Sequence, residues 1–333
     1  MKKLFSLLVF IPCLFLTTNV SAWAQDNDTD TTIKPFKNLN LSVSAGTIGL
    51  GIDLSTKINS YVGLRAGFTY MPQFEPKVKF GIEGGRYDFD GNWVTTHFEN
   101  ISSKLQEFTG LNIDSNIDMV GKPNFYNFNL LVDVYPFENK KWHFTTGIYY
   151  GPSDIGKAKN SIEDMQSLLG VSLYNNIYDK IINGEPIIGN DMYLSPDIED
   201  KFYDLGRMGI RVGDYKRDVY DSEGNVVHLK GEPYMMEPDA NSMVKATMKV
   251  NRIKPYLGFG YEGALLKHDP SYKISFDCGV MFWGGKPQLI THDGTDLIND
   301  VENVYGKVGD YVDAIKTFEV YPMLNIRITK TLF

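Results

Sequence analysis

One stretch constrains the fold more than any other: residues 48–70, which read IGLGIDLSTKINSYVGLRAGFTY. Large apolar residues alternate there with glycine, polar and charged residues, on both sides of a short polar break. A period of two is typical of β-strands, and the break predicts a hairpin. A soluble sandwich would cover the apolar face with a second sheet, whereas a membrane-spanning barrel would turn it toward lipid. The residues of that face are Ile48, Leu50, Ile52, Leu54, Val62, Leu64, Ala66, Phe68 and Tyr70.

The turn of this hairpin sets the register of its two strands. An odd number of loop residues is needed to keep both apolar sets on one face. With Ile58-Asn59-Ser60 as the loop, Asp53 is expected directly opposite Arg65. Opposite charges stabilise facing strands, and inside a narrow barrel each charge would need its partner.

The N-terminus predicts export from the cytoplasm. Residues 1–24 have a basic start, an apolar middle and the small-x-small end Ala22-Trp23-Ala24. This is the pattern of a secretory signal peptide cleaved after Ala24, and a polar periplasmic lead-in is expected over 25–38. Cleavage leaves 309 residues and moves the formal net charge from −8 to −10, because two lysines are lost. So acidic a chain argues against nucleic-acid binding.

Cysteine content and hydropathy narrow the class further. Cys13 lies in the signal peptide and Cys278 remains alone, so no internal disulfide is expected. After the signal peptide, no stretch approaches the ~18 continuous apolar residues of a spanning helix. If the chain crosses a membrane, it must therefore do so as a closed barrel, since lipid cannot satisfy an open sheet edge.

Alternation recurs along the chain and predicts one β-barrel domain over 39–333 with eight antiparallel strands. An even number of strands places both termini on the periplasmic side. Residues 244–250 alternate in the opposite parity to 253–263, which predicts a bulge near Asn251-Arg252. The expected strands are 39–45, 48–55, 62–70, 125–137, 142–150, 253–263, 272–282 and 320–333.

Connection lengths give the barrel an orientation. The connections near 72–122, 152–243 and 285–317 are long and the others are short. Long outer loops with short periplasmic turns are typical of outer-membrane barrels. Outward-facing aromatic residues also fall at two heights, which predicts two girdles. Tyr70, Tyr126, Tyr150 and Phe282 are expected at the outer end, and Trp142, Tyr261 and Tyr272 at the periplasmic end.

The long loops carry structure of their own. Asp90-Gly91 within 86–93 predicts a hairpin. Ser161 and Asp164 are spaced as a capping box and predict a helix, and a second helix is expected over 295–315. Packing of these helices on the barrel rim is favoured over a lid or a partner-binding surface. The apolar stripe expected of the first helix is Leu169, Leu173, Ile177 and Ile181.

With its signal peptide, its rhythm of strands and loops over 39–333 and its terminal Phe333, the chain resembles the eight-stranded outer-membrane barrels of the OmpA/OmpX type. The resemblance implies an all-β, up-and-down transmembrane barrel with helical insertions in the outer loops. It implies a monomer in the outer membrane of a Gram-negative bacterium, in contact with lipid and lipopolysaccharide. It also implies that the barrel-insertion machinery reads Phe333. Thr331 departs from the pattern, since a large apolar residue is usual there, and the long loops exceed those of the small members.

Charged residues on the inward face are expected to form an ion-pair network. A barrel of ~8 strands encloses little more than side chains, so a filled lumen is favoured over a selectivity lining of an open pore. Interior glycines leave room for long basic side chains. The expected members are Asp53, Arg65, Asp133, Lys254, Glu262, Asp277 and Arg327.

The sequence offers little support for a catalytic site or a metal site. Membrane barrels that act as hydrolases or acyltransferases use a Ser/His/acid set. Of the five histidines, His143 alone is expected to point into the lumen, beside Thr145 and not a serine. A structural, hydrogen-bonded histidine is favoured. No histidine pair has metal-ligand spacing and no cofactor motif occurs, so no catalytic, cofactor or metal site is expected.

Three functions from different classes stay open. The favoured one is a non-enzymatic barrel that serves envelope structure, adhesion or binding of a surface ligand or host partner through its large loops. The alternative is a narrow passive channel for small solutes or ligands. A membrane-embedded hydrolase or acyltransferase is the weaker alternative.

Overall fold

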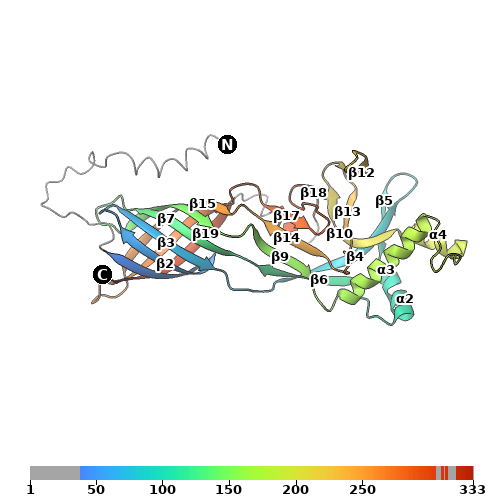
Figure 1. Cartoon of the computed structure of the whole chain (residues 1–333), viewed down its shortest axis with the longest axis horizontal. Helices are drawn as coiled ribbons and strands as arrows, with labels where there is room; N and C mark the ends of the chain where they lie inside the picture. The colour runs from blue at the N-terminus through green and yellow to red at the C-terminus, as the bar shows by residue number, and fades with distance from the viewer. Residues whose placement is uncertain (1–37, 305–308, 311, 314–319, 333) are drawn as a thin grey trace. The chain divides into compact units, whose positions relative to one another are not determined.

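The computed structural model describes residues 38–304, 309–310, 312–313 and 320–332. The predicted signal peptide, nearly all of the predicted lead-in and Phe333 lie outside these ranges. Eight antiparallel strands close into a barrel in the order β1-β19-β16-β15-β8-β7-β3-β2, which confirms the predicted barrel (Figure 1). They are β1 (Leu39–Gly46), β2 (Gly49–Lys57), β3 (Val62–Tyr70), β7 (Tyr126–Val134), β8 (Trp142–Tyr150), β15 (Ile253–Ala264), β16 (Tyr272–Phe282) and β19 (Val320–Thr331).

The outside of the barrel is a continuous apolar surface. Leu50, Phe128 and Leu324 are each more than half exposed, at 57%, 57% and 60%. The residues between them on the same strands face the lumen and are mostly glycine or polar, with apolar exceptions such as Leu131 and Met323. An apolar exterior around a polar interior is the arrangement of a transmembrane barrel, because hydrocarbon is the solvent that suits it. Among the helices of the described residues, none is long and apolar enough to cross a membrane.

The first hairpin corrects one expected position. Gly46 pairs with Gly49, so Thr47 and Ile48 alone make the turn. Gly49 has φ 96°, and a Cβ there would lie 2.2 Å from the Tyr70 carbonyl oxygen. This turn folds Ile48 inward to 2% exposure, so its expected place on the lipid-facing side is wrong.

The second hairpin corrects the expected register. Asp53 pairs with Gly67, and Arg65 pairs with Ser55, so Asp53 and Arg65 are not directly opposite each other. The loop is two residues longer than expected because the Asn59 side chain accepts hydrogen bonds from the N–H groups of Tyr61 and Val62, both at 2.8 Å. Its length is still odd, so Asp53 and Arg65 both face the lumen.

The three long connections build a second sheet, which the expectation of helical insertions did not include. Its strand order is β13-β10-β4-β6-β9-β14-β17, with β18 paired to β10 and β5 paired to β4; β11 and β12 pair separately. Each connection contributes at least two strands, so the loops fold together. The strands are β4 (Lys77–Tyr87), β5 (Trp93–His97), β6 (Asn116–Pro123), β9 (Asp154–Asn160), β10 (Arg207–Tyr215), β11 (Val219–Tyr220), β12 (Val226–His228), β13 (Pro233–Met236), β14 (Lys245–Lys249), β17 (Gln288–Thr291) and β18 (Val301–Glu302).

Helices of the first two connections accompany this sheet where the chain is described: α2 (Glu99–Thr109), α3 (Met165–Ile182) and α4 (Pro196–Leu205) (Figure 1). We call the second sheet, the β11–β12 pair and these helices the loop module. Its core draws on all three connections, with Phe98 from the first, Leu168 and Met208 from the second and Val301 from the third. The predicted hairpin over 86–93 is confirmed by the pairing of Tyr87 with Trp93.

The helix predicted from Ser161 is confirmed as α3, but its expected packing is wrong. The Ser161 hydroxyl donates to the Asp164 carboxylate at 2.7 Å and accepts from the Asp164 N–H at 3.2 Å just before the helix begins. The Asn175 side chain then bonds to the backbone N–H and C=O of Met208 at 2.9 and 2.8 Å. The helix therefore packs on β10 of the loop module and not on the barrel rim.

Two further expectations about the loops are wrong in part. In the expected stripe of α3, Leu169 and Leu173 are 46% and 42% exposed, while Leu168 and Val171 are buried instead. Ile181, at the end of the stripe, is buried as expected. A helix is contradicted over 295–304, because β18 occupies Val301–Glu302 and turns precede it, whereas the described residues 309–310 and 312–313 are helical as expected. The remainder of that range lies partly outside the described residues.

The expected bulge near Asn251-Arg252 is instead a boundary between sheets. β14 ends at Lys249 in the loop module and β15 begins at Ile253 in the barrel. Hydrogen bonds span the boundary, from the Val250 N–H to the Ser153 carbonyl at 2.9 Å and from the Gly151 N–H to the Arg252 carbonyl at 3.1 Å. The parity of the apolar residues reverses because they face the interior of the sheet in β14, as Ala246 does, but face outward in β15, as Leu257 does.

Candidate functional site

The half of the lumen nearer the short turns holds charged and polar side chains from five barrel strands. Arg65 on β3 donates to Asp133 on β7 at 2.9 Å, and Thr145 on β8 donates to the same carboxylate at 2.6 Å. Arg327 on β19 donates to Asp277 on β16 at 3.3 Å. Exposed fractions of 4% for Arg65 and 2% for Arg327 show that neither guanidinium reaches water freely.

His143 belongs to this network. Its Nε2 lies 2.7 Å from the Asp277 carboxylate, and the residue is 1% exposed. Gly260 makes room for the pair, since a Cβ there would lie 2.6 Å from the His143 ring. The other ring nitrogen, Nδ1, is buried without a hydrogen-bond partner in the described part of the chain. A histidine that activates a nucleophile needs a hydroxyl or thiol on its ring, and here the ring instead binds a carboxylate already held by arginine.

Three other predicted lumen residues are held separately. Asp53 accepts a hydrogen bond from the Asn129 amide at 2.9 Å. Glu262 pairs with Lys273 at 2.7 Å near the end of the barrel and is only partly buried. Lys254 is 0% exposed, and its ammonium donates to the Asn127 side chain at 3.2 Å and, over longer distances, to two backbone carbonyls. Six of the seven predicted members are fully buried, but they form several groups and not one continuous network.

The opposite half of the lumen is packed with apolar and aromatic side chains, which sequence reasoning missed. Leu131, Met281 and Met323 are at most 3% exposed, and the rings of Tyr149 and Tyr256 meet edge to face at 5.5 Å. These residues form one cluster with Phe125 and Trp283. A signal for them exists, because Leu131 shares the inward parity of Asn129 and Asp133. This signal was overlooked because the alternation of apolar and polar residues suggested that every inward position would be polar or glycine.

The free space that remains is small. A hollow at the short-turn end reaches Asp133 and Arg327 and holds about 20 Å³, which is room for roughly one water molecule. Beyond it lie the buried arginine–carboxylate pairs and then the apolar cluster. In the described part of the barrel, side chains therefore occupy both halves of the lumen.

The girdle residues lie on the outside at the ends of the strands. Tyr70 pairs with Tyr126 at one end, and Trp142 pairs with Tyr261 at the other, where their rings lie 5.0 Å apart. Tyr150 is 48% exposed, whereas Phe282 and Tyr272 are half-buried.

The loop module is braced by its own ion pairs. Arg207 on β10 binds both carboxylate oxygens of Glu237 at 2.6 Å and also contacts Asp179 on α3. The hydrogen bonds to Glu237 raise the pKa of Arg207 above its ordinary value. Tyr234 donates to Asp293 at 2.7 Å, and burial raises the pKa of that phenol. These groups hold the strands and the helix of the module together.

The surface of the loop module is rich in exposed apolar side chains. Phe89 at the tip of the β4–β5 hairpin is fully exposed, and Ile162 is 79% exposed. Ile188 and Tyr220 are 65% and 58% exposed on other parts of the module. Unlike the outside of the barrel, this surface has no lipid to cover it if it projects into water. Within the described ranges, no group of three or more His, Cys, Asp or Glu residues is arranged to hold a metal ion.

Comparisons with known proteins give no family. No protein-family model matches the chain, and no curated protein matches it. Two crystal structures of Acinetobacter baumannii proteins, CarO2 and CarO, are similar at 14% and 13% identity, each with a TM-score of 0.36. The alignments cover 88% and 90% of this chain and 98% and 99% of those chains.

A major outer membrane protein from Thermus thermophilus is similar at 11% identity with a TM-score of 0.28. That alignment covers 89% of this chain and 98% of that one. These identities and TM-scores are too low to carry a function over to this chain.

Proposed function

We propose that this protein is an integral outer-membrane β-barrel that anchors a surface-exposed binding module and does not conduct solutes or catalyse a reaction. One observation carries the proposal. Three connections far apart in sequence fold into one module with its own core, while the lumen of the barrel holds a hollow of only about 20 Å³. A chain built to pass solutes would leave its lumen open, and a chain built only to fill membrane would need no folded module.

The orientation follows from the connections. Long loops face outward and short turns face the periplasm in outer-membrane barrels. The exposed apolar side chains of the module, such as Phe89 and Ile162, then face the cell exterior. Exposed apolar side chains on a folded outward-facing module are available for contact with a protein or ligand, which is consistent with binding or adhesion as the role.

Conductance tests the closed lumen. Refolded protein in planar bilayers should give no stable single-channel steps, because buried ion pairs and the cluster around Met281 block the path. A double variant, Met281→Ala with Met323→Ala, removes bulk from that cluster and serves as the comparison. Stable conductance of the unmodified chain would overturn the proposal in favour of the channel.

Loop replacement tests the binding role. In one variant, residues 77–123, 154–249 and 288–302 are replaced by short glycine–serine turns. Cells that display this variant should keep a folded, heat-modifiable barrel but lose adhesion to a panel of immobilised host glycans and matrix proteins. A matched variant, Phe89→Ser, tests the exposed hairpin tip alone. Full adhesion without the module would contradict the proposed role.

A further inference from the structure

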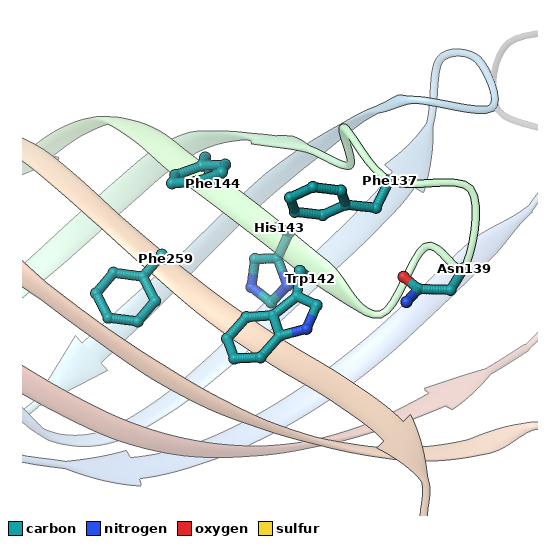
Figure 2. A pocket seen from close by; sticks show the side chains of 6 residues that line it. All are labelled: Phe137, Asn139, Trp142, His143, Phe144 and Phe259. Atoms are coloured by element: carbon teal, nitrogen blue, oxygen red, sulfur yellow. The ribbon is translucent and has the colours of Figure 1, made fainter.

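A hollow of about 490 Å³ lies on the outer surface of the barrel at the short-turn end. Figure 2 shows Phe144 on β8 and Phe259 on β15, which are paired across the two strands, with Phe137 and Asn139 on the turn before β8. Trp142 and His143 complete the lining. Its volume falls in the range of ~300–1,000 Å³ that is usual for ligand sites. We call it the turn groove.

The turn that borders the groove is held by hydrogen bonds within it and to the neighbouring turn between β2 and β3. The Tyr135 N–H donates to the Tyr61 carbonyl at 2.8 Å, and the Lys140 N–H donates to the Phe137 carbonyl at 2.9 Å. The Asn139 side chain accepts from the Lys141 N–H at 3.1 Å. Tyr135 turns inward and is buried, while Phe137 projects outward and is 51% exposed. Phe137 therefore lines the groove from the turn.

Basic residues gather at this end of an acidic chain. In the described turns and strand ends, five lysines stand against two acids, although the whole sequence has a formal net charge of −8. Lys140 and Lys141 lie between Asn139 and Trp142, which both line the groove. Glu262 and Lys273 neutralise each other at 2.7 Å. The lysines are Lys57, Lys140, Lys141, Lys267 and Lys330, and the acids are Glu138 and Asp269.

We propose that the turn groove binds one anionic glycerophospholipid of the periplasmic leaflet, with an acyl chain across Phe144 and Phe259 and the phosphate beside Lys140 and Lys141. The inference rests on the proposed outer-membrane orientation, which places these turns at the periplasmic interface. Apolar walls suit an acyl chain, and interfacial aromatic residues such as Trp142 sit at the level of the headgroups. Lysines at the membrane surface attract anionic lipid.

Tryptophan quenching tests the site directly, because Trp142 lines the groove. The remaining tryptophans of the mature chain are Trp93 in the loop module and Trp283, which is 5% exposed in the lumen cluster. The chain is titrated in detergent micelles with phosphatidylglycerol or phosphatidylcholine carrying the same brominated acyl chains. Phosphatidylglycerol should quench half-maximally at about a tenfold lower mole fraction. Trp142→Phe should remove this quenching.

Four further variants separate headgroup from acyl-chain recognition. Lys140→Gln with Lys141→Gln should abolish the preference for phosphatidylglycerol and leave quenching by phosphatidylcholine unchanged. Phe137→Ala should weaken quenching by both lipids. Lys267→Gln with Lys330→Gln, and Phe276→Ala on the exposed face of β16, should behave as the unmodified chain. Equal quenching by both lipids in the unmodified chain would overturn the proposed site and indicate ordinary lipid contact. An equal loss of quenching in the control variants would do the same.

A separate measurement tells failure of the groove from failure of the orientation. Asn139→Cys in intact cells should resist a membrane-impermeant maleimide until the outer membrane is opened, with the unmodified chain as the control for Cys278. Labelling in intact cells would place the short turns at the cell surface and overturn the proposed orientation. Protection together with unselective quenching would overturn the groove alone.

Discussion

Arg65 and Asp133 are a buried pair whose two charges depend on each other. Their side chains are 5% and 4% exposed and 2.9 Å apart. Removing one partner leaves an uncompensated charge out of water. We expect Arg65→Met to lower the free energy of unfolding by about 3–5 kcal/mol, measured by urea titration of the barrel in lipid vesicles. Arg65→Met with Asp133→Leu should recover part of that loss.

An exposed pair of the same chemistry is the control. Arg86 and Asp204 are 3.0 Å apart, with side chains 35% and 72% exposed. Arg86→Met should cost less than about 1 kcal/mol, because water screens such a pair. Equal costs at Arg65 and Arg86 would show that the lumen is hydrated and that its ion pairs do not fill it.

Asp88 predicts a local pH dependence at the β4–β5 hairpin. Hydrogen bonds from the N–H groups of Asn92 at 2.8 Å and Asp90 at 3.0 Å lower the pKa of this carboxyl. Because the pKa is lower in the folded than in the unfolded chain, the stabilisation is present at neutral pH and is lost as the pH falls through the folded pKa. Amide exchange over 86–94 should therefore lose protection below about pH 4, once corrected for intrinsic rates.

Asp88→Asn keeps the acceptor oxygen and removes the titration, so its hairpin should show no acid-dependent loss. Asp221 offers an internal comparison. Its carboxylate accepts hydrogen bonds from the Asn225 side-chain amide at 3.1 Å and from the N–H groups of Asn225 and Glu223 at 2.8 and 2.9 Å, and these bonds lower its pKa as well. In the Asp88→Asn variant, amide exchange over 219–228 should therefore still lose protection at acid pH. An unchanged profile over 86–94 would assign the effect to another group.

At the scale of elements, α3 offers a matched pair of leucines. Leu168 is 1% exposed in the core of the loop module, whereas its neighbour Leu169 is 46% exposed. Leu168→Ala should destabilise the module by about 2–5 kcal/mol through lost contacts and a cavity. Leu169→Ala should stay within about 0.5 kcal/mol. Denaturation followed by Trp93 fluorescence measures both, and a larger effect at Leu169 would restore the stripe expected from the sequence.

The barrel strands could be predicted because a physical constraint leaves one solution for them. Lipid on one side and a narrow lumen on the other force strict alternation, as in Leu50, Ile52 and Leu54. The buried face of helix α3 was not predicted correctly, because Leu168 and Leu169 are both apolar. The sequence does not say which of the two faces packs on the sheet. The sheet of the loop module could not be predicted, because the pairing between β4 and β10 joins segments more than a hundred residues apart in the sequence.

The candidate site was also predictable only in part. Inward charges such as Arg65 and Asp277 were predictable from parity. Their partners were not, since a shift of two residues at the Asn59 turn exchanges Asp53 for Asp133 as the partner of Arg65. The turn groove carries no periodic signal at all, because it is formed where a turn side chain, Phe137, meets two strands.

At the scale of the whole molecule, the chain has two hydrophobic cores of different kinds. One cluster around Phe98 and Met208 holds the loop module, and another around Leu131 and Met281 fills the barrel. The barrel is closed and has no sheet edges, whereas β13 and β17 are edge strands of the module. The module should therefore unfold first, and the barrel should outlast it.

Phe98→Ala tests this order of unfolding. Phe98 is 0% exposed in the module core, so its truncation should cost about 3–5 kcal/mol there and shift only the first of two thermal transitions. Trp93 fluorescence reports the module, and heat-modifiable electrophoretic mobility reports the barrel. Leu131→Ala, at a site 2% exposed in the barrel cluster, should shift the second transition instead. If both variants move a single common transition, the module and the barrel unfold as one cooperative unit, and the anchor cannot persist while its binding module is unfolded.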